Sequence, residues 1–277
     1  PKPQNPGNMK FKLMKEPEDC ELIRCIEPVK AFMPQPDMEQ SASDVGEGTV
    51  TRFVGRLPKV DVGPACIDTE NYRIFAGFRE PSRVIRGFSF NEEEAPLTSG
   101  WFPKDFSGVG YLGEVFEGRG PIIALGTMGG TIHLWDCDSQ KSCVKLSGHL
   151  TAPRVFAYDP RSKIFVSGGD DTNIKVWDLR NPMVSRQSLT TFKSHTGLIT
   201  CLHMCSSTRT LLSGADDGYL MMWDMASFKQ VCTVKIGTPQ ASYPICLAAQ
   251  GSMARIAVGC LNKTVKFFTV EQNGPGA

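Results

Sequence analysis

Histidine, serine and aspartate residues recur in this sequence at spacings that could bring them together. Two sets share one spacing, in which a tryptophan is preceded by Asp at six positions, Ser at ten and His at 28: His149, Ser167, Asp171, Trp177 and His195, Ser213, Asp217, Trp223. A hydroxyl, an imidazole and a carboxylate in hydrogen-bond contact are the groups of a hydrolase triad. Because an active site is needed only once, two copies in consecutive segments favour a structural role over catalysis.

The segment Cys201-Leu-His203-Met-Cys205 carries side chains that bind zinc well. On a flat strand, however, alternate side chains lie about 7 Å apart, which is far for three ligands of one ion. No second cluster supplies the missing ligands, so ordinary strand residues are favoured over a metal site. The sequence also lacks a P-loop, a dinucleotide-binding glycine motif and the motifs of zinc proteases and α/β-hydrolases. We therefore expect no metal and no cofactor.

A basic and aromatic stretch runs from Phe78 to Phe88 and could contact a phosphate backbone. Strand alternation places Arg86 on one face and Arg83 on the other, which splits the positive charge. With 30 basic and 29 acidic residues, the chain also has no global basic field. A solvated strand edge is favoured over nucleic-acid or phosphoinositide binding.

Composition indicates a folded, turn-rich protein. The 277 residues are 41% hydrophobic and include 27 glycines and 19 prolines, which favours an all-β fold. The ten cysteines are scattered without a C-x-x-C pair, as is typical of reduced thiols in an intracellular protein. No apolar run approaches the ~20 residues of a membrane span, and the polar start of the chain shows no signal peptide.

Three segments end alike and define a repeat. They are Thr131–Asp136, Asn173–Asp178 and Tyr219–Asp224, and their tryptophans at 135, 177 and 223 are 42 and 46 residues apart. Each segment follows a short apolar run and a turn rich in Gly or Asp, which predicts two strands joined by a tight turn.

These residues resemble the WD-repeat family, whose members form β-propellers with one four-stranded blade per repeat. The resemblance implies a single all-β propeller of six to seven blades. We expect an N-terminal extension at 1–19, the propeller at 20–272 and a tail at 273–277. Within the propeller, degenerate blades span 20–98, clear blades span 106–236, and a last blade spans 242–272 with Phe267 or Phe268 near the Trp position.

Weaker signals lie outside the clear repeats. Residues 65–90 predict one degenerate blade, and residues 41–53 predict a turn and strand of another. Residues 91–105 are interpreted as a surface loop. The segment Glu21–Ile26 resembles an outer strand, and in this family an N-terminal strand often completes the last blade and closes the ring.

The resemblance also implies a role for the two polar sets. Asp would accept from His, His would link to Ser, and the Trp ring N–H would supply the last donor, in a buried network within each blade. In the repeat of Trp135, the corresponding positions by count are Ser107, Leu125 and Gly129. That blade is therefore predicted to lack the network and to be held by packing alone.

The segment Trp177-Asp178-Leu-Arg180 resembles the W-D-x-R motif with which propeller-type substrate receptors of cullin ubiquitin ligases contact an adaptor. The competing interpretation is a surface Arg paired with a neighbouring acid. The leading functional hypothesis is a non-catalytic scaffold, in the cytoplasm or nucleus, that binds proteins or peptides within a multi-subunit complex. The alternatives are a ubiquitin-ligase substrate receptor using Trp177, Asp178 and Arg180, and an enzyme with its site in the central channel.

Overall fold

The structure is a computed structural model that describes residues 9–13, 62–68, 73–78, 84–89, 98–101, 106–181, 187–239, 241–250 and 255–272. The secondary structure of these residues consists of strands and turns, without a helix. The strands form five antiparallel four-stranded sheets. This confirms the all-β fold with four-stranded blades that the repeats predict.

Four of the sheets use consecutive strands. The first is β2 (Val62–Asp68), β3 (Arg73–Phe78), β4 (Val84–Ser89) and β5 (Thr98–Trp101). The second is β6 (Phe106–Gly113), β7 (Ile122–Thr127), β8 (Thr131–Asp136) and β9 (Lys141–Ser147). The third is β10 (Pro153–Asp159), β11 (Ile164–Gly169), β12 (Ile174–Asp178) and β13 (Thr190–Phe192). The fourth is β14 (Ile199–Cys205), β15 (Thr210–Ala215), β16 (Tyr219–Asp224) and β17 (Lys229–Lys235).

The fifth sheet joins the two ends of the chain. Its order is β1 (Met9–Leu13), β20 (Val265–Gln272), β19 (Arg255–Cys260) and β18 (Pro244–Ala249). A strand from the N-terminal region therefore does complete the last blade. It is Met9–Leu13, within the segment that we assigned to an extension, whereas the expected Glu21–Ile26 lies outside the described residues. The signal is the alternation of apolar and lysine residues in MKFKL, which is short and easily overlooked.

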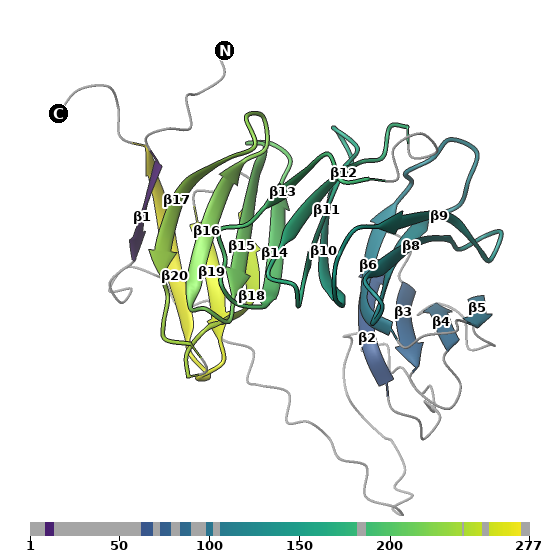
Figure 1. Cartoon of the computed structure of the whole chain (residues 1–277), viewed down its shortest axis with the longest axis horizontal. Helices are drawn as coiled ribbons and strands as arrows, with labels where there is room; N and C mark the ends of the chain where they lie inside the picture. Colours follow the sequence, from purple (N-terminus) through teal and green to yellow (C-terminus); the bar gives the residue numbers. More distant parts are fainter. Residues whose placement is uncertain are drawn as a thin grey trace, which may run out of the picture.

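The five sheets follow one another along an arc (Figure 1). The first strands of consecutive sheets, β2, β6, β10, β14 and β18, contact one another in that order. In the second to fifth sheets the turn between the second and third strands lies beside the start of the first strand, because the first residue of that strand pairs with the last residue of the second strand. This end of the sheets lies toward the bottom of Figure 1. We call this end of the sheets the lower rim. The number of blades in the whole chain, expected to be six to seven, stays a prediction.

Apolar side chains fill the space between neighbouring sheets. On β11, Phe165 packs into the cluster shared with the second sheet, whereas Ile164 and Val166 pack against the fourth. This division follows from the period-two alternation of a strand. Trp177 and Trp223 likewise each join a cluster shared with the preceding sheet. The tryptophans that recur along the sequence therefore mark a recurring contact between neighbouring sheets.

Two further expectations meet the structure here. The segment 91–105, interpreted as a loop, contains strand β5, which pairs with β4 as the outer strand of the first sheet. A strand of four residues flanked by prolines gives little periodic signal, which is why the interpretation was wrong. The predicted turn and strand at 41–53 lies outside the described residues.

Candidate functional site

The first polar set is brought together in the third sheet. The His149 Nδ1 atom lies 3.0 Å from both carboxylate oxygens of Asp171, and its Nε2 atom lies 2.7 Å from Ser167 Oγ. Trp177 Nε1–H donates to the same Ser167 Oγ at 2.8 Å. Asp171 also accepts from the backbone N–H of Leu150 and Asn173. One carboxylate therefore holds both the incoming loop and the turn between β11 and β12.

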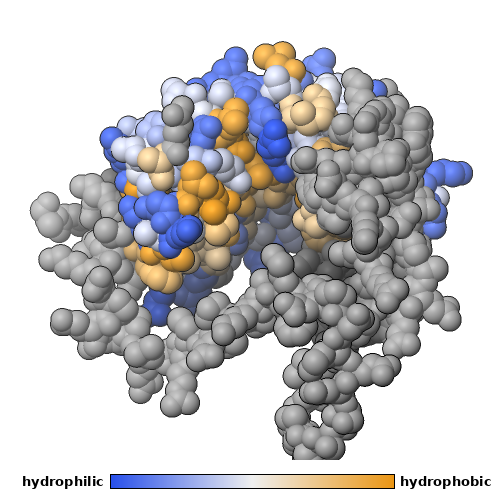
Figure 2. All heavy atoms as spheres, turned by 90° about the horizontal axis from the view of Figure 1, so that it is seen from below, coloured by the Kyte–Doolittle hydropathy of each residue, from blue (hydrophilic) through white to orange (hydrophobic). Residues whose placement is uncertain are grey.

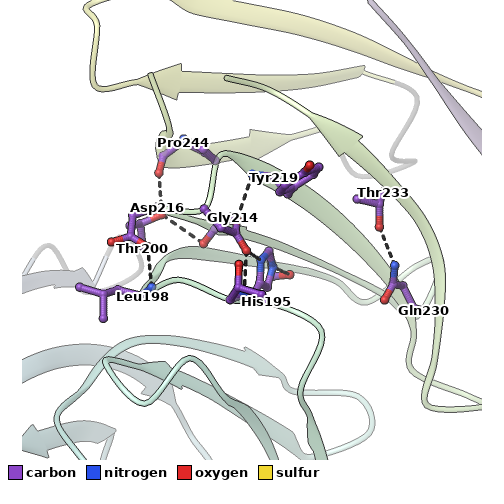
Figure 3. Close-up of polar contacts among 12 residues, drawn as sticks. His195, Leu198, Thr200, Gly214, Asp216, Tyr219, Gln230, Thr233 and Pro244 are labelled. Carbon is purple, nitrogen blue, oxygen red and sulfur yellow. Dashed lines mark hydrogen bonds and ion pairs between the residues drawn. The ribbon is translucent and has the colours of Figure 1, made fainter. Parts of the chain in front are cut away.

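The second set repeats this arrangement in the fourth sheet. The His195 Nδ1 atom lies 2.9 Å from Asp217 Oδ2, and its Nε2 atom lies 2.9 Å from Ser213 Oγ. Trp223 Nε1–H donates to Ser213 Oγ at 2.8 Å. The backbone N–H groups of Thr196 and Tyr219 donate to Asp217. Figure 3 shows His195 within this cluster, between the entering loop and the sheet.

The donors and acceptors of each set fix the direction of the hydrogen bonds. The carboxylate accepts, so the histidine carries its proton on Nδ1. The serine oxygen accepts from the Trp ring N–H and is also hydrogen-bonded to the histidine Nε2. Every side-chain polar atom of the chain from Trp to Asp therefore has a hydrogen-bond partner.

Burial of the serines argues against nucleophilic catalysis by these sets. Ser167 and Ser213 are 0% exposed, so neither hydroxyl can reach a substrate. Each serine hydroxyl is also hydrogen-bonded to a histidine that is closed to solvent, because the His149 and His195 side chains are 0% and 1% exposed. The arrangement can stabilise a sheet, and it offers no space for an acyl group.

The sheet of Trp135 is built differently. Leu125 stands where Ser167 and Ser213 stand in the next sheets, and Leu125 and Trp135 belong to one buried apolar cluster with Phe75 and Phe106. Ser107, however, does not occupy the histidine position. It lies on β6, because the connection from β6 to β7 is longer than its counterparts and a bulge at Tyr111/Gly113 adds to the count. Counting back from the tryptophan across that connection assigned Ser107 wrongly.

The first strands of four sheets, which we call the inner strands, share a β-bulge beside the lower rim, and the bulge leaves one residue of each strand unpaired. The pairing of β6, β10, β14 and β18 with the next strand shifts at the same register, and the extra residues are Ser107, Arg154, Thr200 and Ile245. We call these the bulge residues. Ser107 Oγ donates to Pro153 O at 2.6 Å, and Thr200 Oγ1 donates to Pro244 O. The Ser107 hydroxyl therefore bonds the second sheet to the third, and the Thr200 hydroxyl bonds the fourth sheet to the fifth, as Figure 3 shows for Thr200 and Pro244.

In these four sheets the lower rim also carries a turn residue at a matching position. The first residue of the inner strand pairs with the last residue of the second strand, and the turn residue is the next one along the chain. The four turn residues are Met128, Asp170, Asp216 and Leu261. In the third sheet the bulge residue Arg154 and the turn residue Asp170 form an ion pair. Sequence analysis missed all of these positions except Ser107, because the bulge that aligns them becomes visible only in the strand pairing.

The W-D-x-R segment lies at the end of β12. Trp177 is buried, Asp178 is the last residue of the strand, and the Arg180 guanidinium donates to both oxygens of Asp178. The Arg180 side chain is nevertheless 68% exposed. The hydrogen bonds from Arg180 lower the pKa of Asp178, so the pair stays charged over the neutral range. The surface pairing that competed with adaptor binding in our interpretation is thus present, on an accessible arginine.

Two candidate sites remain, the Cys201–Cys205 segment and the basic stretch at 78–88. No group of three or more His, Cys, Asp or Glu side chains among the described residues could hold a metal ion. In the Cys201–Cys205 segment, burial raises the pKa of the Cys201 thiol to about 12, so this thiol is protonated at neutral pH. The side chains of the basic stretch at 78–88 lie outside the described residues. In the part of the chain that the structure describes, no helix is long and apolar enough to cross a bilayer.

The carboxylate of Asp171 is strongly perturbed. Burial alone would raise its pKa, but the hydrogen bonds from His149 and from the Leu150 N–H outweigh burial and lower the pKa from 3.8 to about 2. The pKa of Asp217 is lowered by the same combination, with His195 and the Thr196 N–H as the donors. Both groups are therefore ionised in the folded protein down to acid pH.

This perturbation predicts a pH dependence of stability. A carboxylate whose pKa is lower in the folded than in the unfolded chain stabilises the fold above pH ~4, and its contribution is lost as the pH falls towards 2. For Asp171 the lowering to about 2 corresponds to about 2 kcal/mol. Urea unfolding of the wild type and of Asp171→Asn from pH 7 to pH 2.5 measures it. We expect the difference in unfolding free energy to be constant above pH ~5 and to shrink below it; a difference independent of pH would contradict the assignment.

Comparison with known proteins agrees with this geometry. The WD domain, G-beta repeat family matches residues 140–178 and 186–224, each of which ends at the Trp-Asp pair of a sheet. Periodic tryptophan protein 2 of Arabidopsis thaliana is 29% identical over 58% of this chain and 17% of its own length. Meiotic fizzy-related protein 1 of Schizosaccharomyces pombe is 35% identical over 44% of this chain and 28% of its own length.

A third relative, cell division control protein 4 of Saccharomyces cerevisiae, is 28% identical over 45% of this chain and 18% of its own length. The matched region thus spans less than a third of each of these curated relatives. Residues 140–178 and 186–224 are WD repeats, and the repeats, the four-stranded sheets and the relatives together support a WD-repeat protein.

Proposed function

We propose that this chain is a non-catalytic scaffold that binds other proteins through the ends of its sheets. The proposal rests mainly on one observation: the serine, histidine and aspartate side chains of the two polar sets, which could have formed a catalytic triad, are hydrogen-bonded to one another in buried networks. A stiff array of sheets loses little conformational entropy when a partner docks, which favours binding. WD-repeat relatives that include a cell division control protein support the same role.

Cross-linking followed by affinity purification and mass spectrometry tests this proposal. The chain is expressed in eukaryotic cells, cross-linked there and recovered under denaturing conditions. We expect reproducible protein partners whose cross-links fall on the residues at the ends of the sheets, rather than on the packed flanks between sheets. Recovery of the chain alone, or cross-links spread evenly over its lysines, would contradict a scaffold role.

The compartment is part of the proposal. All eight cysteines among the described residues are free thiols, and most are at least half-buried. This supports a reducing, intracellular environment in the cytoplasm or nucleus. The proposed domain is a single propeller that includes the N-terminal strand β1.

A substrate-receptor role in a cullin-type ubiquitin ligase is the second candidate, favoured by the exposure of Arg180. We expect Arg180→Glu to abolish co-purification with the adaptor and to leave the urea unfolding midpoint unchanged, because the side chain is exposed. Arg180→Lys is the matched control that keeps the charge. Equal recovery of adaptor with wild type and Arg180→Glu would remove this candidate. An enzyme with a site in the central channel is the alternative of another class, and no described feature favours it.

A further inference from the structure

The lower rim differs in polarity from sheet to sheet. In the third and fourth sheets the bulge and turn residues are polar: Arg154 with Asp170, and Thr200 with Asp216. In the fifth sheet both positions are apolar, because Ile245 and Leu261 take their places. The backbone geometry is the same, since Asp170, Asp216 and Leu261 each donate a backbone N–H to the residue before the inner strand. The fifth sheet therefore carries an apolar pair at the positions where the third and fourth sheets carry a polar pair.

The two side chains of this apolar pair are exposed to solvent. Ile245 is 45% exposed and Leu261 is 43% exposed, although the preceding Pro244 and Cys260 are buried. Leu198, at the entry to β14, is 40% exposed. Figure 2 looks onto this end of the molecule and shows hydrophobic residues gathered beside a hollow. Packing within the sheets does not require these three side chains.

An acidic group lies among these apolar residues. Asp216 stands between Leu198 and the Pro244 strand (Figure 3). Its Oδ1 accepts the backbone N–H of Leu198 at 2.6 Å, which fixes the carboxylate in place. The equivalent Asp170 has its charge matched by Arg154, whereas no cationic side chain among the described residues pairs with Asp216. We call Leu198, Asp216, Ile245 and Leu261 the rim patch.

We propose that the rim patch binds a protein segment in which an arginine or lysine is flanked by bulky apolar side chains. This rests on the proposed scaffold function and names the surface and the chemistry of the partner. The cation pairs with Asp216, and the apolar side chains cover Leu198 on one side and Ile245 and Leu261 on the other. The pre-fixed carboxylate loses no side-chain entropy on binding, and the flanking apolar contacts exclude water from the ion pair.

Fluorescence anisotropy with synthetic peptides tests this proposal. The probes are labelled nine-residue peptides on a Ser/Gly background that contain one Arg between two Leu, with one to three residues separating Arg from each Leu. Two control series replace Arg by Glu or both Leu by Ser. We expect saturable binding of the wild-type chain by at least one Leu-Arg-Leu peptide, with affinity at least about tenfold above both controls.

The variants use residues that the neighbouring sheets already carry. Ile245→Thr with Leu261→Asp copies the fourth sheet and is expected to weaken binding about tenfold or more. Asp216→Asn keeps the acceptor for the Leu198 N–H and is expected to remove the preference for Arg over Glu. Two controls are expected to bind as the wild type. Asp170→Asn neutralises an aspartate already paired with Arg154. Leu189→Ser removes a leucine that is 52% exposed and lies just before β13, beside β12 and outside the rim patch.

Three outcomes would overturn the proposal: no peptide of the series binds, the patch variants bind as the wild type, or the controls lose binding equally. Urea unfolding of every variant separates loss of the patch from loss of the fold. The cross-linking experiment separates the two proposals. If the wild type and the patch variants recover the same proteins, the scaffold function stands and the rim patch is wrong; if neither recovers any protein, the scaffold function itself fails.

Discussion

Asp217→Ala is expected to lower the free energy of unfolding by about 2–3 kcal/mol. The carboxylate accepts from His195 Nδ1 and from the backbone N–H groups of Thr196 and Tyr219, and all three donors lose their partner together. The cost is large because the His195 side chain is 1% exposed, so water cannot replace the lost acceptor. Urea unfolding followed by tryptophan fluorescence measures it.

Asp217→Asn is the matched control for this prediction. With its amide oxygen in the place of Oδ2, it still accepts from His195 Nδ1 and from the Thr196 N–H, two of the three hydrogen bonds, so we expect less than half of the loss seen with alanine. Asp171→Ala should behave as Asp217→Ala does, because Asp171 holds His149 and two backbone N–H groups in the same way. A loss below about 0.5 kcal/mol for either alanine variant would show that the set does not stabilise its sheet.

Phe165→Ala is expected to destabilise the protein by about 3–5 kcal/mol. The Phe165 side chain is 0% exposed and lies between the second and third sheets, in the cluster that contains Trp177 and Ile122. Its ring stacks on Phe156 with a centroid distance of 5.6 Å. Removing it leaves a cavity between two sheets that the closely packed strands cannot fill.

Two comparisons make this prediction specific. Phe165→Leu keeps most of the volume and should cost less than half as much. Leu189→Ala removes a leucine that is 52% exposed and should change the free energy of unfolding by less than about 0.5 kcal/mol. If Phe165→Ala unfolds at the urea concentration of the wild type, the packing between the second and third sheets does not hold the arc together.

The sequence predicts those parts of the fold in which side-chain type follows a period. Tryptophans recurring every forty-odd residues located the sheets of Trp135, Trp177 and Trp223, since each ring packs against the preceding sheet. The fifth sheet was also predicted, and its strand pairing places Phe268, rather than Phe267, at the Trp position. The short strands β1 and β5 were not predicted. Their five and four residues contain too few alternations of apolar and polar side chains to be distinguished from a loop.

The candidate site divides in the same way. The residues of the two polar sets could be predicted because their spacing repeats in the sequence. The bulge residues, one of which lies in the rim patch, could not be predicted, because Ser107, Arg154, Thr200 and Ile245 share a position but not a side-chain type. Only the β-bulge shows that they correspond, and a bulge leaves no periodic signal in the sequence. For the same reason, counting residues back from Trp135 assigned Ser107 wrongly to the histidine position, because the sequence does not show the bulge at Tyr111/Gly113 or the long connection from β6 to β7.

A double-mutant cycle between Ser213 and Asp217 tests most directly whether the polar sets are structural networks. The proposed role as a non-catalytic binding protein depends on this. The free energies of unfolding of Ser213→Ala, Asp217→Ala and the double variant are measured against the wild type. Because both residues act through His195, we expect the double loss to fall short of the sum by about 1 kcal/mol or more. Losses that add without coupling, or single variants as stable as the wild type, would contradict this account.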